Sequence, residues 1–177
     1  NQYTITFDVD GGSGIDPITA DYGTEVTAPA DPTKTGYTFV GWEPALPTTM
    51  PAENVTITAK WTINQYTITF NTDGGSSIAP ITVDYGAAII APADPTKEGY
   101  TFVGWEPELP ATMPAGNLEL KAKWEVKQYT LTWVVDGQET KVTYNFGEEI
   151  TPLVAPEKTG YTFTGWDPEI PTTMPAE

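Results

Sequence analysis

One stretch of nine residues occurs three times in this chain, and this repetition limits the possible folds more than any other feature. Gly-Tyr-Thr-Phe-Val-Gly-Trp-Glu-Pro occupies residues 36–44 and 99–107, and a close copy occupies residues 160–168. A period near 63 residues is typical of tandem copies of one structural unit. We therefore predict three domains, called the first, second and third repeat below, at residues 1–63, 64–126 and 127–177.

Each repeat is near the lower size limit for independent folding, where only about 60% of the surface of the unfolded chain becomes buried. The chain has no cysteine, which excludes disulfides and thiolate metal ligands. Six Trp, nine Tyr and six Phe supply large rings instead. Because one ring buries much apolar area, we expect aromatic side chains to build the small cores.

The charge is strongly acidic, with 24 Asp and Glu against 8 basic residues and a net charge of −16. An even negative surface disfavours binding to nucleic acid, so we expect no nucleic-acid partner. No apolar run approaches the roughly 20 residues of a membrane span, and no targeting signal is recognisable. The chain is interpreted as an interior segment of a longer protein.

Alternation of apolar and polar residues predicts a mainly β fold. Period-two patterns mark strands at residues 3–9, 18–21, 37–42 and 55–61 of the first repeat. Asp-Gly at positions 10 and 11 predicts a tight turn after the first of them. The segment Pro29–Lys34 is too rich in proline for a strand and has room for one helical turn.

The connections between the repeats are short. Four residues, Thr62–Gln65, separate the last predicted strand of the first repeat from the next strand, and Glu125–Gln128 form the second connection. Neither contains Gly, Pro or Ser, so neither has the composition of a flexible linker. We expect neighbouring repeats to contact each other and to hold a restricted angle.

Three motifs in fixed order resemble the Listeria–Bacteroides repeat family, also called the internalin B-repeat. They are Asp-Gly-Gly at 10–12, Gly-Tyr-Thr-Phe-Val-Gly-Trp at 36–42, and the segment from Met50 to Trp61. The resemblance implies small α+β modules of β-grasp type with parallel first and last strands, in an elongated head-to-tail array. It also implies a location outside the cell, in secreted or cell-surface proteins of bacteria, and no catalytic residues.

The third repeat departs from this pattern. Val134–Glu139 replaces the Asp-Gly-Gly turn, which predicts a tighter hairpin, and Trp133 stands where Phe7 stands in the first repeat. The sequence ends at Met174–Glu177, before a third copy of the closing strand. Either the fragment simply ends there, or a neighbouring chain supplies the strand by strand exchange.

The sequence offers little for catalysis, so we predict neither an enzyme nor a bound cofactor. Without His or Cys, the usual catalytic triads cannot form, and zinc loses its usual ligands. Asp8 to Gly12 resembles the start of a calcium loop, but Thr19 stands where an EF-hand needs Glu, and turn geometry explains the motif. Lys60 and Asn54 suggest an isopeptide bond, which the expected exposure of Lys60 disfavours.

Three tryptophans, Trp42, Trp105 and Trp166, are the candidate ligand or inter-module contacts. Each ring either stacks on a sugar or packs on its own repeat or on the next one, and we favour packing. We therefore predict a non-catalytic stalk or spacer whose partners are the neighbouring modules of its parent protein. The alternative is a multivalent binding module for a glycan or a host surface protein, because weak repeated sites gain avidity.

Overall fold

The computed structural model describes residues 1–176, and these residues form strands, turns and loops without a helix. Ten strands follow in order: β1 (Gln2–Asp8), β2 (Ile18–Asp21), β3 (Tyr37–Glu43), β4 (Val55–Ile63), β5 (Gln65–Asn71), β6 (Ile81–Asp84), β7 (Tyr100–Glu106), β8 (Leu118–Val126), β9 (Gln128–Val135) and β10 (Gln138–Asn145). The prediction of a mainly β fold is confirmed. The helical turn considered for Pro29–Lys34 is wrong, since two prolines in that segment remove backbone donors.

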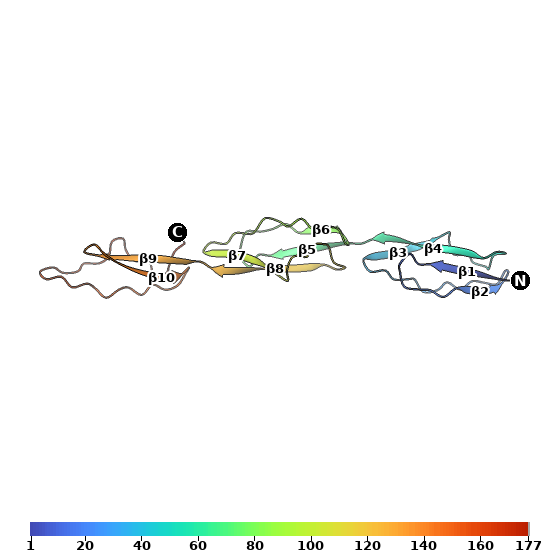
Figure 1. The fold of residues 1–177 in the computed structure, drawn as a ribbon, viewed down its shortest axis with the longest axis horizontal. Coiled ribbons are helices and arrows are strands. Elements are labelled where there is room, and N and C mark those ends of the chain that lie inside the picture. The colour runs from blue at the N-terminus through green and yellow to red at the C-terminus, as the bar shows by residue number, and fades with distance from the viewer. Residues whose placement is uncertain (177) are drawn as a thin grey trace. The chain divides into compact units, whose positions relative to one another are not determined.

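The first repeat forms a four-stranded sheet in the order β2-β1-β4-β3 (Figure 1). β1 and β4 are parallel, with Ile5 opposite Val55, while β2 and β3 are antiparallel edge strands. The parallel pair places the first and last strands of the repeat side by side, as the β-grasp resemblance implies. A long loop, residues 22–36, occupies the place where a β-grasp fold would carry its helix.

Alternation builds the core of this sheet. Ile5, Phe7 and Ile57 lie on one face of β1 and β4 and are buried, while Thr6 and Thr56 on the other face are exposed. Met50 is 1% exposed and packs on the same cluster from the loop between β3 and β4. Met50 therefore anchors the loop between β3 and β4 to the core.

The second repeat has the same strand order, β6-β5-β8-β7. Its register repeats that of the first sheet, with Ile68 opposite Ile81 and Tyr100 opposite Val126. Its buried apolar residues stand at equivalent positions: Ile68, Met113, Leu120 and Ala122.

The third repeat contains only the β9–β10 hairpin among the described residues. The turn at Asp136-Gly137 joins eight paired residues on each side, so the predicted tighter hairpin is confirmed. Residues 161–167 nearly repeat the sequence of β3 and β7 but are not a strand. In the first two repeats this segment pairs as a strand with β4 or β8, and the third has no described strand at that position.

Close packing divides the chain into two compact units that cross the repeat boundaries. The first unit contains Asn1–Thr69, Pro80–Ile90 and Pro110–Leu118. The second contains Phe70–Ala79, Ala91–Leu109 and the chain from Glu119 onward. Each unit therefore holds one complete connection between repeats.

Candidate functional site

A β-bulge sets the position of the first candidate tryptophan. The β3–β4 register shifts between Phe39 and Gly41, so Val40 is an extra residue. One extra residue reverses the alternation and turns Phe39 and Trp42 to the same side of the strand. Their ring centroids lie 5.1 Å apart, edge to face. The Phe-x-Gly-Trp part of the repeated motif is thus the sequence of a bulge that pairs two rings.

The three candidate tryptophans lie half-buried within their own repeats. Trp42 also contacts Phe7 at 5.1 Å between ring centroids and packs on the core of the first repeat. Equivalent contacts join Trp105 to Phe70 and Phe102, and Trp166 to Trp133 and Phe163. This packing gives each ring a structural role, and the alternative, that these rings bind a glycan, is untested.

The sequence reasoning missed a lysine cluster, defined in the first repeat by Lys34, Asp10, Tyr37 and Trp61. Lys34 Nζ donates to the Asp10 carbonyl oxygen at 2.7 Å and lies 4.7 Å from the centre of the Tyr37 ring. The same nitrogen lies 5.6 Å from the Trp61 ring, so one cation joins the turn, a loop and the closing strand. Its signal was visible, because lysine precedes the repeated Gly-Tyr by two positions in all three copies.

The cluster recurs with small differences. Lys97 contacts the Asp73 carbonyl and the rings of Tyr100 and Trp124 at nearly the same distances. Lys158 donates to Asp136 Oδ1 at 2.6 Å and lies 5.3 Å from the Tyr161 ring.

Turn geometry accounts for the motif that resembled a calcium loop. Asp10 and Gly11 have φ angles of 46° and 80°, and Gly12 N–H donates to the Val9 carbonyl at 2.9 Å. Two consecutive residues with positive φ are typical of a type I′ hairpin turn, which Asp-Gly favours. The carboxylate of Asp10 pairs with Lys34. Residues 1–176 contain no group of acidic side chains placed to hold a metal ion.

Lys60 and Asn54 have separate partners. Lys60 forms an ion pair with Glu43 across β3 and β4, and just over half of its side chain is exposed, as expected. Its hydrogen bond and its charge, in that order, lower the pKa of Glu43. Asn54 Oδ1 instead accepts the Thr4 backbone N–H at 2.9 Å. The two side chains needed for an isopeptide bond therefore have different contacts.

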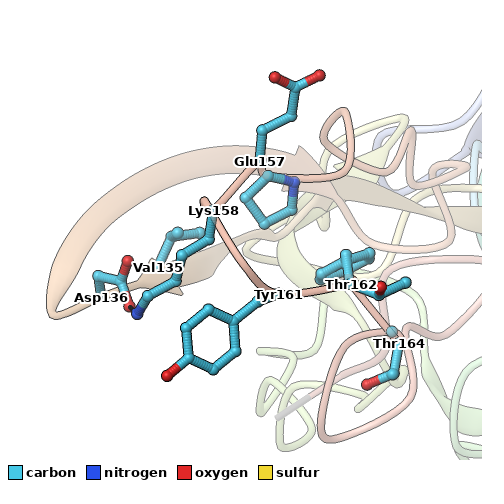
Figure 2. Close-up of a pocket in the computed structure, with 10 residues that line it drawn as sticks. Val135, Asp136, Glu157, Lys158, Tyr161, Thr162 and Thr164 are labelled. Atoms are coloured by element: carbon cyan, nitrogen blue, oxygen red, sulfur yellow. Dashed lines mark hydrogen bonds and ion pairs between the residues drawn. The ribbon is translucent and has the colours of Figure 1, made fainter.

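A groove of about 210 Å³ lies in the third repeat, lined by Val135, Asp136, Lys158, Tyr161 and Phe163 among others (Figure 2). Lys158 extends toward Asp136, with Tyr161 beside it. In the first repeat the equivalents of Val135, Lys158 and Phe163 all contact Trp61, whose indole N–H donates to the Val9 carbonyl. Strand exchange would fill this groove with a tryptophan-bearing strand, and it stays a prediction.

The connections between repeats are tighter than predicted, since a single residue separates consecutive strands. Between β4 and β5 this residue is Asn64, whose N–H donates to the Gly36 carbonyl at 2.9 Å. Its own carbonyl accepts the Tyr85 N–H at 2.8 Å. Lys127 makes the same two bonds with Gly99 and Phe146, both at 2.8 Å. These two hydrogen bonds use backbone groups only, so Asn64 and Lys127 make them alike, and the Asn64 side chain separately accepts a hydrogen bond from the Thr38 hydroxyl at 2.6 Å.

This chain is similar to a known repeat family and to known proteins. A family model described as the Listeria-Bacteroides repeat domain matches residues 3–60, 66–123 and 129–170. A protein of Evansella cellulosilytica described as a Gly-rich membrane protein is 34% identical over 94% of this chain and 21% of its own length. Internalin H of Listeria monocytogenes is 39% identical over 69% of this chain and 25% of its own length.

Among solved structures, tandem SHIRT domains 3-4 of a streptococcal cell surface protein align over 71% of this chain and 98% of their own. The identity is 18% and the TM-score is 0.25, too low to support an argument. The chain spans about a fifth to a quarter of the length of the curated relatives it matches. No helix in residues 1–176 has the length and hydropathy of a membrane span. With three consecutive family matches over most of its length, the chain belongs to the Listeria–Bacteroides repeat family.

Proposed function

We propose that this segment is a non-catalytic stalk or spacer of a bacterial cell-surface or secreted protein, where it projects an adhesive or other functional domain. The relatives support this proposal in two ways. Their descriptions include a membrane protein and an internalin. This chain also aligns with only about a quarter or less of those proteins, so most of their length lies outside the matched segment.

The observation that carries the proposal is the parallel pairing of β1 with β4. In this register, β4 continues from Thr58, opposite the end of β1, for five more residues to Ile63. The chain therefore enters the repeat at one end of the sheet and leaves at the other. With a rise of about 3.3 Å per residue, this path advances the chain by about 36 Å in one repeat. A fold with adjacent termini would not lengthen a protein when it is copied.

The short connections favour a restricted angle between consecutive repeats, so that the lengths of the repeats add. A single residue joins β4 to β5, and both of its backbone polar groups are hydrogen-bonded to the repeats on either side. A connection of this kind resists bending more than a flexible linker rich in Gly or Ser.

Small-angle X-ray scattering of the 177-residue chain tests the proposal. If the lengths of the three repeats add, we expect a particle about 100 Å long with a radius of gyration of about 30 Å. A single globule of this size would give about 16 Å. A variant with Gly-Ser-Gly-Ser inserted after Asn64 serves as a control, because a loosened connection broadens the distance distribution. A radius near the globular value for the unaltered chain would refute the spacer proposal.

A further inference from the structure

The first glycine of the repeated motif lies under an aromatic ring from the following repeat. Gly36 is buried, and a Cβ atom added to it would overlap the ring of Tyr85. Gly99 is also buried, and a Cβ there would overlap the ring of Phe146. Both glycines have φ near 75°, so the left-handed backbone and the close approach of the ring each favour glycine.

The covering ring makes the same second contact in both connections. Tyr85 meets Tyr37 edge to face, with centroids 6.1 Å apart and an interplanar angle of 78°. Phe146 meets Tyr100 at 5.9 Å and 77°. Because tyrosine and phenylalanine give the same geometry, ring shape and not the hydroxyl group determines the contact. Contacts of this type are among the favourable arrangements of aromatic pairs.

Copies without a partner show what the contact contributes. Tyr22 stands in the first repeat where Tyr85 stands in the second, and 67% of it is exposed. Gly160 is the third copy of the glycine; it has φ of 80° and open space around it. The adjacent Tyr161 is 75% exposed, whereas Tyr37 is half-buried. The glycine is therefore covered at the two connections, where a neighbouring repeat meets it, and is open at the third copy.

We propose that the buried glycine and the tyrosine after it form a recognition surface whose partner is the aromatic-Gly turn of the next repeat. In this chain, the partner turns are Tyr85-Gly86 and Phe146-Gly147. The contact couples neighbouring repeats, because local opening of the second repeat at Tyr85 would expose Gly36 and the Tyr37 ring of the first repeat. For its biological use this inference rests on the proposed spacer function, but the coupling itself is measured independently.

A double-mutant cycle with amide hydrogen exchange in the 177-residue chain tests the proposal. The reporter is the Tyr37 N–H, which donates to the Lys34 carbonyl at 3.0 Å. Gly36→Ala is expected to raise its exchange rate at least tenfold more than Gly160→Ala raises that of Tyr161. The Tyr161 N–H is a matched reporter, since it donates to the Lys158 carbonyl at 3.0 Å. Both substitutions strain a left-handed backbone, and only Gly36→Ala meets a ring.

The second arm removes the ring. Tyr85→Ala alone is expected to raise the exchange rate at Tyr37, in the preceding repeat, at least tenfold. In the Tyr85→Ala background, Gly36→Ala should raise the exchange rate at Tyr37 by no more than Gly160→Ala raises the exchange rate at Tyr161. Tyr22→Ala is the control for losing a ring at an exposed copy of the turn, and it should change exchange at Tyr37 less than threefold.

Equal effects of Gly36→Ala with and without Tyr85 would overturn the proposal, as would a Tyr85→Ala effect confined to the second repeat. These results are separable from those on the spacer function. If scattering shows an extended particle but the double-mutant cycle shows no coupling, only this inference is refuted. If the cycle shows coupling but scattering shows a globular particle, only the spacer proposal is refuted.

Discussion

Replacing Trp61 with alanine removes the side chain that ties the closing strand to the rest of the first repeat. Its indole N–H donates to the Val9 carbonyl at 3.2 Å, and its ring meets Phe39 edge to face at 5.6 Å. Lys34 lies over its face, and the indole also lies against Gly12, where a Cβ would come within 2.6 Å of it.

The expected loss follows from these contacts. A fully buried tryptophan replaced by alanine costs about 3–5 kcal/mol. Trp61 is half-buried, so we expect about 2–3 kcal/mol from lost packing, an aromatic pair, a cation–π contact and one hydrogen bond. Trp61→Phe keeps much of the ring packing and loses the indole donor, so its cost should be about 1 kcal/mol.

Amide hydrogen exchange measures the free energy of local opening at each strand pair. With Trp61→Ala, amides of the β3–β4 pair should exchange about 30- to 150-fold faster, which is the rate change that corresponds to this free energy. The β9–β10 hairpin is the internal reference, because it belongs to the other compact unit. A change below about fivefold at β3–β4, or an equal change at β9–β10, would refute the reasoning.

Three further predictions concern groups that the sequence singled out. Because the pKa of Glu43 is lowered in the folded state, the ion pair with Lys60 stabilises the fold above the ordinary value of 4.5 and is lost as pH falls through the lowered pKa. Carbon-13 titration should show the pKa returning toward 4.5 in Lys60→Met; no change would contradict the assignment. Millimolar calcium should leave the melting temperature unchanged, because the Asp10 motif is a turn, and a rise in scanning fluorimetry would argue for a site. Intact mass should show no loss of ammonia, since Lys60 and Asn54 have separate partners, and a loss would indicate an isopeptide bond.

The sequence predicts the strands of the first repeat well, because alternation and turn residues are local signals. β2 begins and ends at the predicted residues, Ile18 and Asp21. β4 extends two residues beyond the predicted end at Trp61, since pairing with β3 continues to Ile63. The helical turn is wrong, because tolerance of proline at a helix start says nothing about which conformation the loop needs.

The lysine cluster and the ring over Gly36 were not predicted, for a physical reason. Each joins residues that are distant in sequence, and Tyr85 belongs to a different repeat from Gly36. A repeated glycine is explained equally well by a turn, so its second role is invisible until the ring above it is placed. The spacing of Lys34 from Gly36 was a usable signal, but only the fold shows which groups surround the cation.

The third repeat shows that the strand preference of a segment is insufficient without a strand to pair with. Tyr161–Asp167 differs from β3 only at Thr164 and Asp167; threonine favours strands, and Asp167 stands at the last position, where β3 also carries an acidic residue that strands disfavour. The segment is nevertheless irregular, while its Phe163–Trp166 ring contact persists at 5.3 Å. The aromatic pair therefore forms without the strand, and the strand forms only where a partner such as β4 supplies hydrogen bonds. It follows that the sequence of this segment alone is insufficient to make it a strand, and that the closing strand of the same repeat completes both the sheet and the cover over the lysine cluster.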